Sequence, residues 1–352
     1  MDLSVDQRQG QRDAAPDAPA IELIGISKAF GPVQANKDIS MKVARGTIHG
    51  IVGENGAGKS TLMSILYGFY KADKGEIRIG GTPTQIANSD DAIRAGIGMV
   101  HQHFMLVQNF TVLENVVLGA EEGRLLKPSL ARARALLTQL AQEYELDVLP
   151  DALISDLAVG FQQRVEILKA LYRHADILIL DEPTGVLTPA EAHHLFRILE
   201  GLKAEGKTII LITHKLREIM AVTDTVSVMR RGEMTATLKT ADTSPTELAE
   251  LMVGRKVLLR VDKPEPKVGE TLMRIRGLKV TAPNGVELLK GIHLNLNAGE
   301  ILGVAGVAGN GQSTLLEVLA GITPASAGSV ELRDETLDLT ARADPGKRRD
   351  QG

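Results

Sequence analysis

The alternation of apolar and polar positions near the start of the chain is typical of strands with one buried face. Three short runs show it, at residues 21–24, 39–43 and 76–79. In each run apolar side chains occupy alternate positions, so one face can pack on a core while the other meets water. The pattern predicts a sheet of half-buried antiparallel strands.

Further along, short apolar runs alternate with segments of helical character. Residues 48–52, 177–180 and 208–212 are continuous or nearly continuous apolar runs, as in strands buried on both faces. Three other segments are predicted as helices: residues 60–68, 189–202 and 244–253. This alternation of strand and helix predicts a doubly wound α/β fold around parallel strands.

A third pattern lies between these two regions, at residues 128–146. Its apolar side chains recur at three- and four-residue intervals, which predicts an amphipathic helix. They are Leu130, Ala133, Leu136, Leu137, Leu140 and Tyr144.

The chain then repeats its own beginning, after an exposed linker. The copies are residues 272–277 for 21–26, 289–294 for the run at 39, 299–304 for 46–52, and 328–332 for 75–79. The second copy stops early, because residues 347–352 align with the region that ends at Gly96 and nothing corresponds to residues 97–253. We therefore expect a disordered polar tail (1–20), a first domain (21–260), a linker (261–270) and a truncated second domain (271–352).

Composition narrows the class of protein without identifying it. The 352 residues are 43% hydrophobic and 24% charged, which is typical of a globular protein with ample core. A net charge of −4 argues against a general nucleic-acid binder, and the absence of cysteine excludes disulfides and thiolate metal sites. The chain shows no membrane-spanning apolar run and no apolar signal core, so we expect a cytoplasmic location with any membrane role supplied by a partner.

The most specific motif follows the strand predicted at residues 48–52. It has the form GxxxxGK[ST] and comprises Gly53, Glu54, Asn55, Gly56, Ala57, Gly58, Lys59 and Ser60, followed by Thr61. Glycines let such a loop turn tightly with its N–H groups inward, and the helix that follows adds partial positive charge. Lys59 would reach the β- and γ-phosphates of a nucleoside triphosphate, and the Ser60 hydroxyl would hold Mg²⁺.

Two acids end the next apolar strand, at residues 177–180. Asp181 suits a water-mediated hold on Mg²⁺, and Glu182 suits a general base that polarises an attacking water. His214 follows the strand at residues 208–212, where it could touch a γ-phosphate at the carboxyl edge of the sheet.

Further motifs resemble those of the ATP-binding cassette family, and the resemblance covers nearly the whole chain from Ile21. Leu157, Ala158, Val159, Gly160 and Phe161 resemble that family's LSGGQ signature and are followed by Gln162, Gln163 and Arg164. The resemblance implies a P-loop cassette of the α/β class: a mixed sheet core with an antiparallel β subdomain and an α-helical subdomain, here followed by an incomplete second cassette.

By the same resemblance, ATP and Mg²⁺ are the cofactors. Gln102 corresponds to the glutamine that senses Mg²⁺ and the water, Phe30 to the aromatic residue that stacks on adenine, and His214 to the switch histidine. The metal would then be served by Ser60, Gln102 and Asp181. In this family two cassettes close head to tail, so the phosphate loop of one faces the signature of the other with ATP between them.

Within the family, the duplicated cassettes and the motifs around Gln102 and Glu182 resemble importer subunits for nucleosides and simple sugars. The resemblance implies that the segment from Gln102 to Gly119 receives a membrane permease, beside the helical region at residues 128–157. A second cassette or a homodimer partner and, indirectly, a solute-binding protein would complete the assembly. The chain would then lie peripherally on the inner face of the cell membrane.

Three positions depart from the family pattern. Ala158 replaces the signature serine and Phe161 replaces the signature glutamine. Residues 306–314 repeat the phosphate loop in the second copy, and there Gln312 replaces the lysine. In the family arrangement these departures fall on one degenerate site. The competent site would need a signature that the second copy does not contain, so we expect either a fragment or a chain that borrows a signature.

Two other functions remain open on the sequence. One is a cassette ATPase that acts on ribosomes or DNA, although the short linker of mixed charge and Gln312 do not favour it. The other is a truncated remnant that binds ATP without hydrolysing it.

Overall fold

The computed structural model describes residues 18–101, 104–120, 126–256, 265, 267–283, 285–306, 309–337 and 339. The chain divides into two compact units, Met1–Leu259 (unit 1) and Arg260–Gly352 (unit 2). Each is described by itself. Half of the predicted linker, residues 261–264 and 266, lies outside the described residues, as do residues 1–17 of the predicted tail. Ala20 is buried, and its backbone bonds to Val43 and Gly80, so packed structure begins by Ala20.

Unit 1 opens with an antiparallel sheet of order β2-β1-β4-β5. Its strands are β1 (Ile21–Phe30), β2 (Val33–Val43), β4 (Lys74–Ile79) and β5 (Thr82–Pro83). β1 pairs with β2 on one side and with β4 on the other, so the three alternating runs of the sequence lie side by side. The prediction of half-buried antiparallel strands is confirmed.

A second sheet forms the centre of unit 1, with the order β10-β9-β3-β8-β7-β6. It consists of β3 (Ile48–Val52), β6 (Ile97–Val100), β7 (Ile177–Asp181), β8 (Thr208–Ile212), β9 (Thr225–Arg230) and β10 (Glu233–Lys239). All neighbours are parallel except β10, which runs antiparallel to β9. The parallel sheet that the sequence predicts is therefore present, with one antiparallel edge strand.

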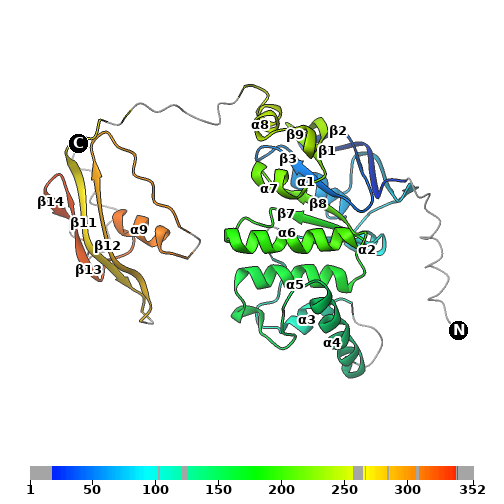
Figure 1. Ribbon diagram of the computed structural model, residues 1–352, viewed down its shortest axis with the longest axis horizontal. Coiled ribbons are helices and arrows are strands. Elements are labelled where there is room, and N and C mark those ends of the chain that lie inside the picture. Colours follow the sequence, from blue (N-terminus) through cyan, green and yellow to red (C-terminus); the bar gives the residue numbers. More distant parts are fainter. Residues whose placement is uncertain are drawn as a thin grey trace. The chain divides into compact units, whose positions relative to one another are not determined.

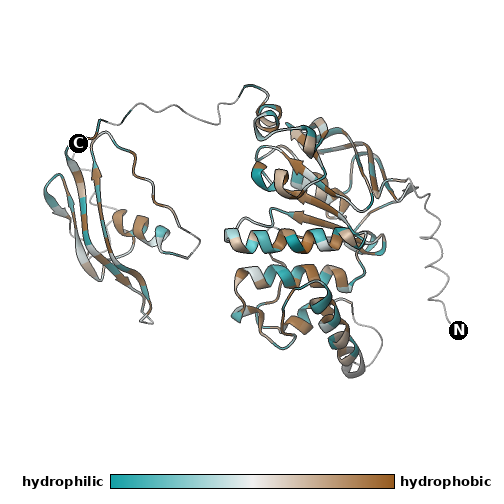
Figure 2. Ribbon diagram, viewed as in Figure 1, coloured by the Kyte–Doolittle hydropathy of each residue, from teal (hydrophilic) through white to brown (hydrophobic). Residues whose placement is uncertain are grey.

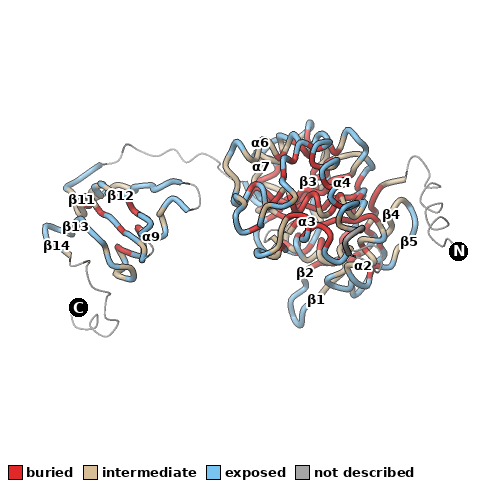
Figure 3. Tube along the Cα trace, turned by 90° about the horizontal axis from the view of Figure 1, so that it is seen from below, coloured by how far each residue is buried: buried red, intermediate tan, exposed pale blue. Residues whose placement is uncertain are grey.

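Successive residues of the central strands enter two separate apolar cores. Leu178 and Leu180 of β7 join the core beneath α6 (Pro189–Ala204), whereas Ile177 and Ile179 join the core shared with the antiparallel sheet. The first core also takes apolar residues from α7 (Leu216–Val222) and α8 (Pro245–Val253), the second from α1 (Lys59–Leu66) and α2 (Ser89–Arg94). Burial on both faces explains why these strands lack alternation, and Figure 3 shows the buried residues gathered through the middle of the unit.

The helices of unit 1 carry clear start signals. Thr188 accepts from the Glu191 N–H and Glu191 from the Thr188 N–H, a capping box at the start of α6, and Ser244 caps α8. Thr111 makes the same box with Glu114 at the start of α3 (Val112–Val117). Figure 2 shows apolar and polar residues alternating along α6, whose buried residues are Leu195, Ile198, Leu199 and Leu202.

A helical subdomain comprises α3, α4 (Leu126–Glu143) and α5 (Val159–Tyr172) (Figure 1). A short 3-10 helix, η2 (Ile154–Asp156), precedes α5. A second 3-10 helix, η3 (Thr240–Asp242), follows β10 of the central sheet. The helix predicted at residues 128–146 ends earlier than expected. Glu145 takes a left-handed φ of 52°, and Leu146 then turns back into the core, where it is fully buried.

Unit 2 contains a sheet of order β12-β11-β13-β14, the same connectivity as the first sheet of unit 1. Its elements are β11 (Thr271–Thr281), β12 (Glu287–Asn297), α9 (Gln312–Leu319), β13 (Ala327–Leu332) and β14 (Glu335–Leu337). The repeat seen in the sequence therefore has a counterpart in the strand pairing.

One repeated segment does not keep its structure. Residues 301–306 echo β3, yet they form no strand, and Ile301 is 93% exposed. In unit 1, β3 is held between β8 and β9. Among the described residues of unit 2 no strand corresponds to β8 or β9, so the same apolar pattern has no ladder partner there.

A buried histidine begins a chain of hydrogen bonds that connects three strands of the central sheet of unit 1. His49 in β3 is 1% exposed, and its Nε2 lies 2.8 Å from the Ser227 hydroxyl of β9. Ser227 in turn lies 2.8 Å from the Thr237 hydroxyl of β10. Burial lowers the pKa of His49 to about 4, so the ring is neutral at neutral pH.

This histidine should make folding sensitive to acid. The unfolded ring titrates near 6.5 and the folded ring near 4, so its contribution is complete above pH 6.5 and is lost as the pH falls toward 4. We expect the free energy of unfolding to fall by about 2 kcal/mol between pH 7.5 and pH 5 through this group. Denaturant titrations should show that component in the chain and in an exposed-histidine control, His174→Gln, but not in His49→Gln. Equal pH dependence in all three would contradict the assignment.

Candidate functional site

The loop between β3 and α1 is built around left-handed glycines. Gly56 has a φ of 82° and Gly58 a φ of 97°, and Gly58 is the N-cap of α1. Residues with a Cβ rarely adopt a backbone φ in this range, so glycine is favoured at both positions. The loop ends at a helix N-terminus, where the orientation of the peptide dipoles favours an anion.

Two glycines of the loop, Gly53 and Gly58, lie close to neighbouring backbone. A Cβ on Gly53 would lie 2.4 Å from the Met229 carbonyl oxygen, and one on Gly58 would lie 2.3 Å from the Ala35 carbonyl oxygen. The loop is thus pressed against β9 and β2, and a larger residue at either position would displace it.

Lys59, the first residue of α1, is 6% exposed. Its Nζ donates to the carbonyl oxygens of Gly53 at 2.8 Å and Glu54 at 3.1 Å. Burial lowers its pKa, while the charges of Glu182 and Asp181 oppose that shift. The ammonium therefore lies inside the curve of the loop and close to both acids.

A buried asparagine that the sequence motifs do not indicate supports the loop from behind. Asn36 of β2 is fully buried, and its Nδ2 donates to the Gly58 carbonyl at 3.0 Å. Gly232 bonds to Ala57 and Lys37 on the same side. The signal that could have revealed Asn36 is an amide at an inward position of an otherwise alternating strand.

Asp181 ends β7 and is 7% exposed. Its Oδ1 is buried and has no hydrogen-bond partner among the described residues. Burial raises the pKa of this carboxyl, and the Ser60 hydroxyl opposes the shift. A buried carboxylate oxygen without a donor, beside a hydroxyl at the start of α1, fits a hard cation such as Mg²⁺.

Glu182 follows directly and bonds to His214. Glu182 Oε1 lies 2.8 Å from His214 Nδ1. The parallel pairing of β7 with β8, in which Asp181 faces Ile212, brings the ends of the two strands together. An ionised carboxylate only accepts hydrogen bonds, so Nδ1 carries the proton in this contact.

The glutamate backbone is unusual. Glu182 has a φ of 49°, a left-handed value for a residue with a side chain, and its N–H donates to the Ile212 carbonyl at 2.9 Å. Such conformations persist where the surrounding structure holds them, and they concentrate at functional sites.

Other residues predicted for the site lie on separate elements. Phe30 ends β1, is 42% exposed and meets the Tyr70 ring edge-to-face at 5.1 Å. The signature-like segment begins α5, with Ala158 as its N-cap and Phe161 beneath the Arg164 guanidinium at 4.6 Å. Gln102 lies outside the described residues.

The second phosphate loop, in unit 2, has a comparable glycine cap. Gly311 precedes α9 with a φ of 92°, close to the 97° of Gly58. The Gln312 side chain lies against Gly306, where a Cβ would be 2.1 Å from its Nε2. An amide thus takes the place of the Lys59 ammonium in the repeat.

The description of the matching family model is ABC transporter, and the match covers residues 36–185 and 289–350. The chain belongs to the ABC transporter family. The two matched segments fall in units 1 and 2, in keeping with the repeat.

Several curated relatives are similar over most of this chain. The glucose import ATP-binding protein TsgD13 of Haloferax volcanii is 48% identical, over 92% of this chain and 63% of its own length. The nucleoside import ATP-binding protein NupA of Lactococcus lactis subsp. cremoris is 47% identical, over 90% and 63%. The guanosine import ATP-binding protein NupO of Bacillus subtilis is 47% identical, over 92% and 63%. The chain thus spans about 63% of the length of these relatives.

Solved ABC cassettes share the fold. The ADP conformation of the cassette MJ1267 is 26% identical with a TM-score of 0.59, and covers 67% of this chain and 99% of that one. The dimeric cassette MJ0796 is 27% identical with a TM-score of 0.55, over 62% and 98%. The cassette fold predicted from the sequence is confirmed by this likeness. The incomplete second cassette stays a prediction.

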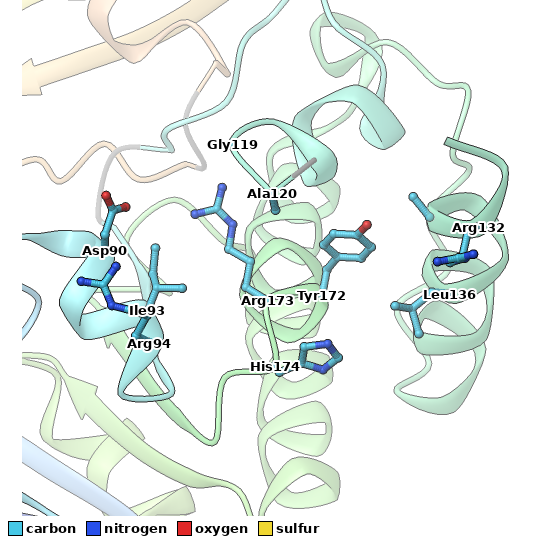
Figure 4. A pocket seen from close by; sticks show the side chains of 11 residues that line it. Asp90, Ile93, Arg94, Gly119, Ala120, Arg132, Leu136, Tyr172, Arg173 and His174 are labelled. Carbon is cyan, nitrogen blue, oxygen red and sulfur yellow. The ribbon is translucent and has the colours of Figure 1, made fainter. Parts of the chain in front are cut away.

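The ABC chain has a cavity of about 370 Å³ in unit 1, away from the phosphate loop in sequence. Its walls come from α2, from the turn after α3, from α4 and from the end of α5. Figure 4 shows Tyr172 and His174 directed toward α4, which carries Arg132, and Arg173 directed toward Ala120. Basic side chains outnumber acidic ones in this lining, so the cavity favours an anionic group.

The segment at residues 104–119, which ends at the cavity, is held by its backbone. Glu166 of α5 accepts from the Met105 N–H at 2.6 Å, and Lys169 donates to the Met105 carbonyl at 3.0 Å. Asn115 of α3 makes the same pair of bonds with Val107, at 2.7 and 3.1 Å. Met105 itself is 59% exposed. The segment therefore presents an apolar side chain from a fixed backbone.

The contact between Gly58 and β2 generates a prediction about nucleotide binding. Gly58→Ala should weaken ATP affinity about tenfold or more, because strain is joined by a clash with a carbonyl that β2 holds in place. Gly56→Ala carries a similar left-handed φ but has open space around its Cβ, which makes it a matched control. Fluorescent ATP-analogue titrations of both variants measure the difference. Equal losses would mean that the clash with Ala35 is relieved at no cost.

Proposed function

We propose that the chain is the ATP-binding and ATP-hydrolysing part of an importer for nucleosides or simple sugars. The observation that supports this most directly is the grouping of Lys59, Asp181 and the Glu182–His214 pair at the ends of β3, β7 and β8. Phosphate binding, a cation site and a general base are the parts that phosphoryl transfer to water requires.

Each of these groups has a distinct task in the proposed reaction. The loop amides and Lys59 would bind the β- and γ-phosphates, and Phe30 would stack on the base. Ser60, Asp181 and Gln102 would hold Mg²⁺, which when bound neutralises charge on the phosphate oxygens. Glu182 would accept the proton of a water whose oxygen bonds to the γ-phosphorus as the bond to the leaving ADP oxygen breaks.

His214 would keep the base in place during this step. Its Nδ1–H donates to Glu182, which fixes one carboxylate oxygen and leaves the other to receive the proton. The strained backbone of Glu182 and the buried amide of Asn36 are further signs that this edge of the sheet is built to a fixed geometry.

The nucleoside and sugar specificity rests on the relatives. Their names describe import of glucose, nucleosides and guanosine, and identities of 47–48% support a shared class of solute. The repeat in unit 2 supports an arrangement of two cassettes, in which another signature completes the site around Lys59. A second cassette or a second copy of the chain would supply that signature.

For the membrane partner we propose the cavity and the segment that leads to it. Among the described residues, no helix combines the length and the apolar character needed to cross a bilayer. In this proposal a permease brings the chain to the inner face of the membrane and contacts Met105 and the basic cavity, whose lining includes Gly119 and Arg132. A solute-binding protein would act indirectly, through that permease.

The assignment of Glu182 as the base can be tested on purified protein. Glu182→Gln should lower steady-state ATP turnover about 100-fold or more, because the amide cannot take the proton, while ATP affinity stays within about twofold. Lys59→Ala should lower ATP affinity itself. The assays are phosphate release and ATP-analogue binding across a range of protein concentrations.

Concentration dependence separates the possible outcomes. Turnover that rises faster than linearly, and disappears in Lys59→Ala, would mean that chains pair and that the Ala158 signature suffices. ATP binding without turnover at any concentration would contradict hydrolysis by this chain and favour a non-hydrolysing role. Full turnover by Glu182→Gln would overturn the assignment of the base.

The permease contact predicts a charge-reversal effect. Arg132→Glu in α4 should weaken association with inner-membrane vesicles of the native host about tenfold or more. The basic cavity favours an anionic group of the permease, and the new carboxylate would repel that group. Arg134→Glu on the same helix does not line the cavity and should have a smaller effect. Co-sedimentation measures both, with ATP-analogue binding as a folding control. Equal effects of the two variants would place the contact elsewhere.

A further inference from the structure

A closed set of hydrogen bonds joins residues that lie next to Glu182 and His214 in the chain. Glu218 of α7 is its acceptor, with a side chain that is 12% exposed. Glu218 Oε1 accepts from the Thr184 hydroxyl at 2.5 Å, and Oε2 accepts from the Thr213 hydroxyl at 3.3 Å. Thr184 lies two residues after Glu182, and Thr213 directly precedes His214.

Lys215 closes the set from the other side. Its Nζ donates to the carbonyl of Thr184 at 2.9 Å and to the Thr184 hydroxyl at 3.0 Å, and lies 3.2 Å from Glu218. Its backbone N–H donates to the Thr213 hydroxyl at 3.0 Å. Thr184 and Thr213 are 2% and 1% exposed, so these bonds are shielded from water.

The arrangement links two loops that are far apart in the sequence. One loop follows β7 and carries Glu182, and the other follows β8 and carries His214. Glu218 bonds to one threonine from each loop. Its own position is fixed by the first turn of α7, where its N–H donates to the Lys215 carbonyl and the helix terminus favours an acid.

Glu182 needs such support because its backbone is left-handed. The φ of 49° is held on one side by the Ile212 carbonyl and on the other by the turn in which the Gly185 N–H donates to the Glu182 carbonyl. Thr184 lies inside that turn, so the bonds from Glu218 and Lys215 act on the segment that maintains the strained residue.

We propose that Glu218 is a positioning residue for hydrolysis, which aligns the Glu182 carboxylate with His214 through Thr184 and Thr213. The proposal rests on the proposed function, in which Glu182 is the base. Glu218 does not touch the reacting atoms. Its effect should therefore fall on the chemical step and leave nucleotide binding nearly unchanged.

The chemistry of the set predicts a graded response. Glu218→Ala leaves two buried hydroxyls and the Lys215 ammonium without their common acceptor, so the turn around Thr184 should loosen. Glu218→Gln keeps one acceptor oxygen on a side chain of the same shape and should rescue most of the loss. We expect turnover to fall about 10- to 100-fold in Glu218→Ala and less than about fivefold in Glu218→Gln, with ATP affinity within about twofold in both.

An exposed glutamate in α8 provides a control for the removal of a first-turn acid. Glu247 also occupies the first turn of a short helix, α8, and accepts from a threonine hydroxyl, that of Thr243, at 2.7 Å. Glu247→Ala removes the same kind of side chain and the same kind of bond without touching either loop. It should leave turnover unchanged.

A second readout does not depend on hydrolysis. In protein labelled with ¹⁵N-histidine, the Nδ1 signal of His214, assigned by its loss in His214→Gln, reports the bond to Glu182. This signal should shift in Glu218→Ala, return in Glu218→Gln and stay in place in Glu247→Ala. The measurement remains informative if the chain alone does not turn over ATP.

The outcomes separate the two proposals. A shifted His214 signal without turnover in any variant would support the positioning role and count against hydrolysis by this chain. Unchanged turnover and an unchanged His214 signal in Glu218→Ala would overturn the positioning role. Parallel loss of turnover, ATP affinity and thermal stability with no shift at His214 would also overturn it, because that pattern marks a general structural role.

Discussion

Burial of β3, β7 and β8 on both faces is the constraint on which the rest of unit 1 depends. Strands buried in this way leave no room for polar side chains along most of their length, so functional groups collect where the strands end. Because the strands are parallel, their carboxyl ends meet at one edge of the sheet. Lys59, Asp181, Glu182 and His214 all follow or end one of these three strands.

The charges of Lys59, Asp181 and Glu182 partly offset one another at this edge of the sheet. Burial alone would favour neutral forms of Lys59 and of Asp181, and it shifts the two pKa values in opposite directions. Their mutual attraction and the charge of Glu182 on Lys59 oppose the lysine shift. A buried cation and buried anions that offset one another can persist at the edge of the core, and the orphaned oxygen of Asp181 leaves one demand that a metal ion would meet.

The sequence predicts those parts of the site that are local in the chain. It indicates the phosphate loop and the Asp181–Glu182 pair because each is a short motif next to an apolar strand. It does not indicate Asn36 or Glu218, because Asn36 bonds to a loop 22 residues away and Glu218 bonds to Thr184 across 34 residues. Such contacts depend on strand order and register, which a single sequence does not state. Helix ends also escaped prediction where packing decides them, as at Leu146.

The repeat in unit 2 shows that a strand-like sequence pattern does not by itself produce a strand. Residues 301–306 carry the apolar pattern of β3 but form no strand, because a ladder needs neighbours as well as propensity. The glycine cap that follows depends only on local conformation, and it keeps nearly the same φ at Gly311 as at Gly58. The two phosphate loops therefore differ less in the shape of this cap than in what surrounds it. The first has a buried ammonium and follows the paired strand β3, whereas the second has an amide and follows residues 301–306, which form no strand. Each cap lies against a strand of its own antiparallel sheet, β2 for Gly58 and β12 for Gly311, so the loops differ in charge and in the segment that precedes them.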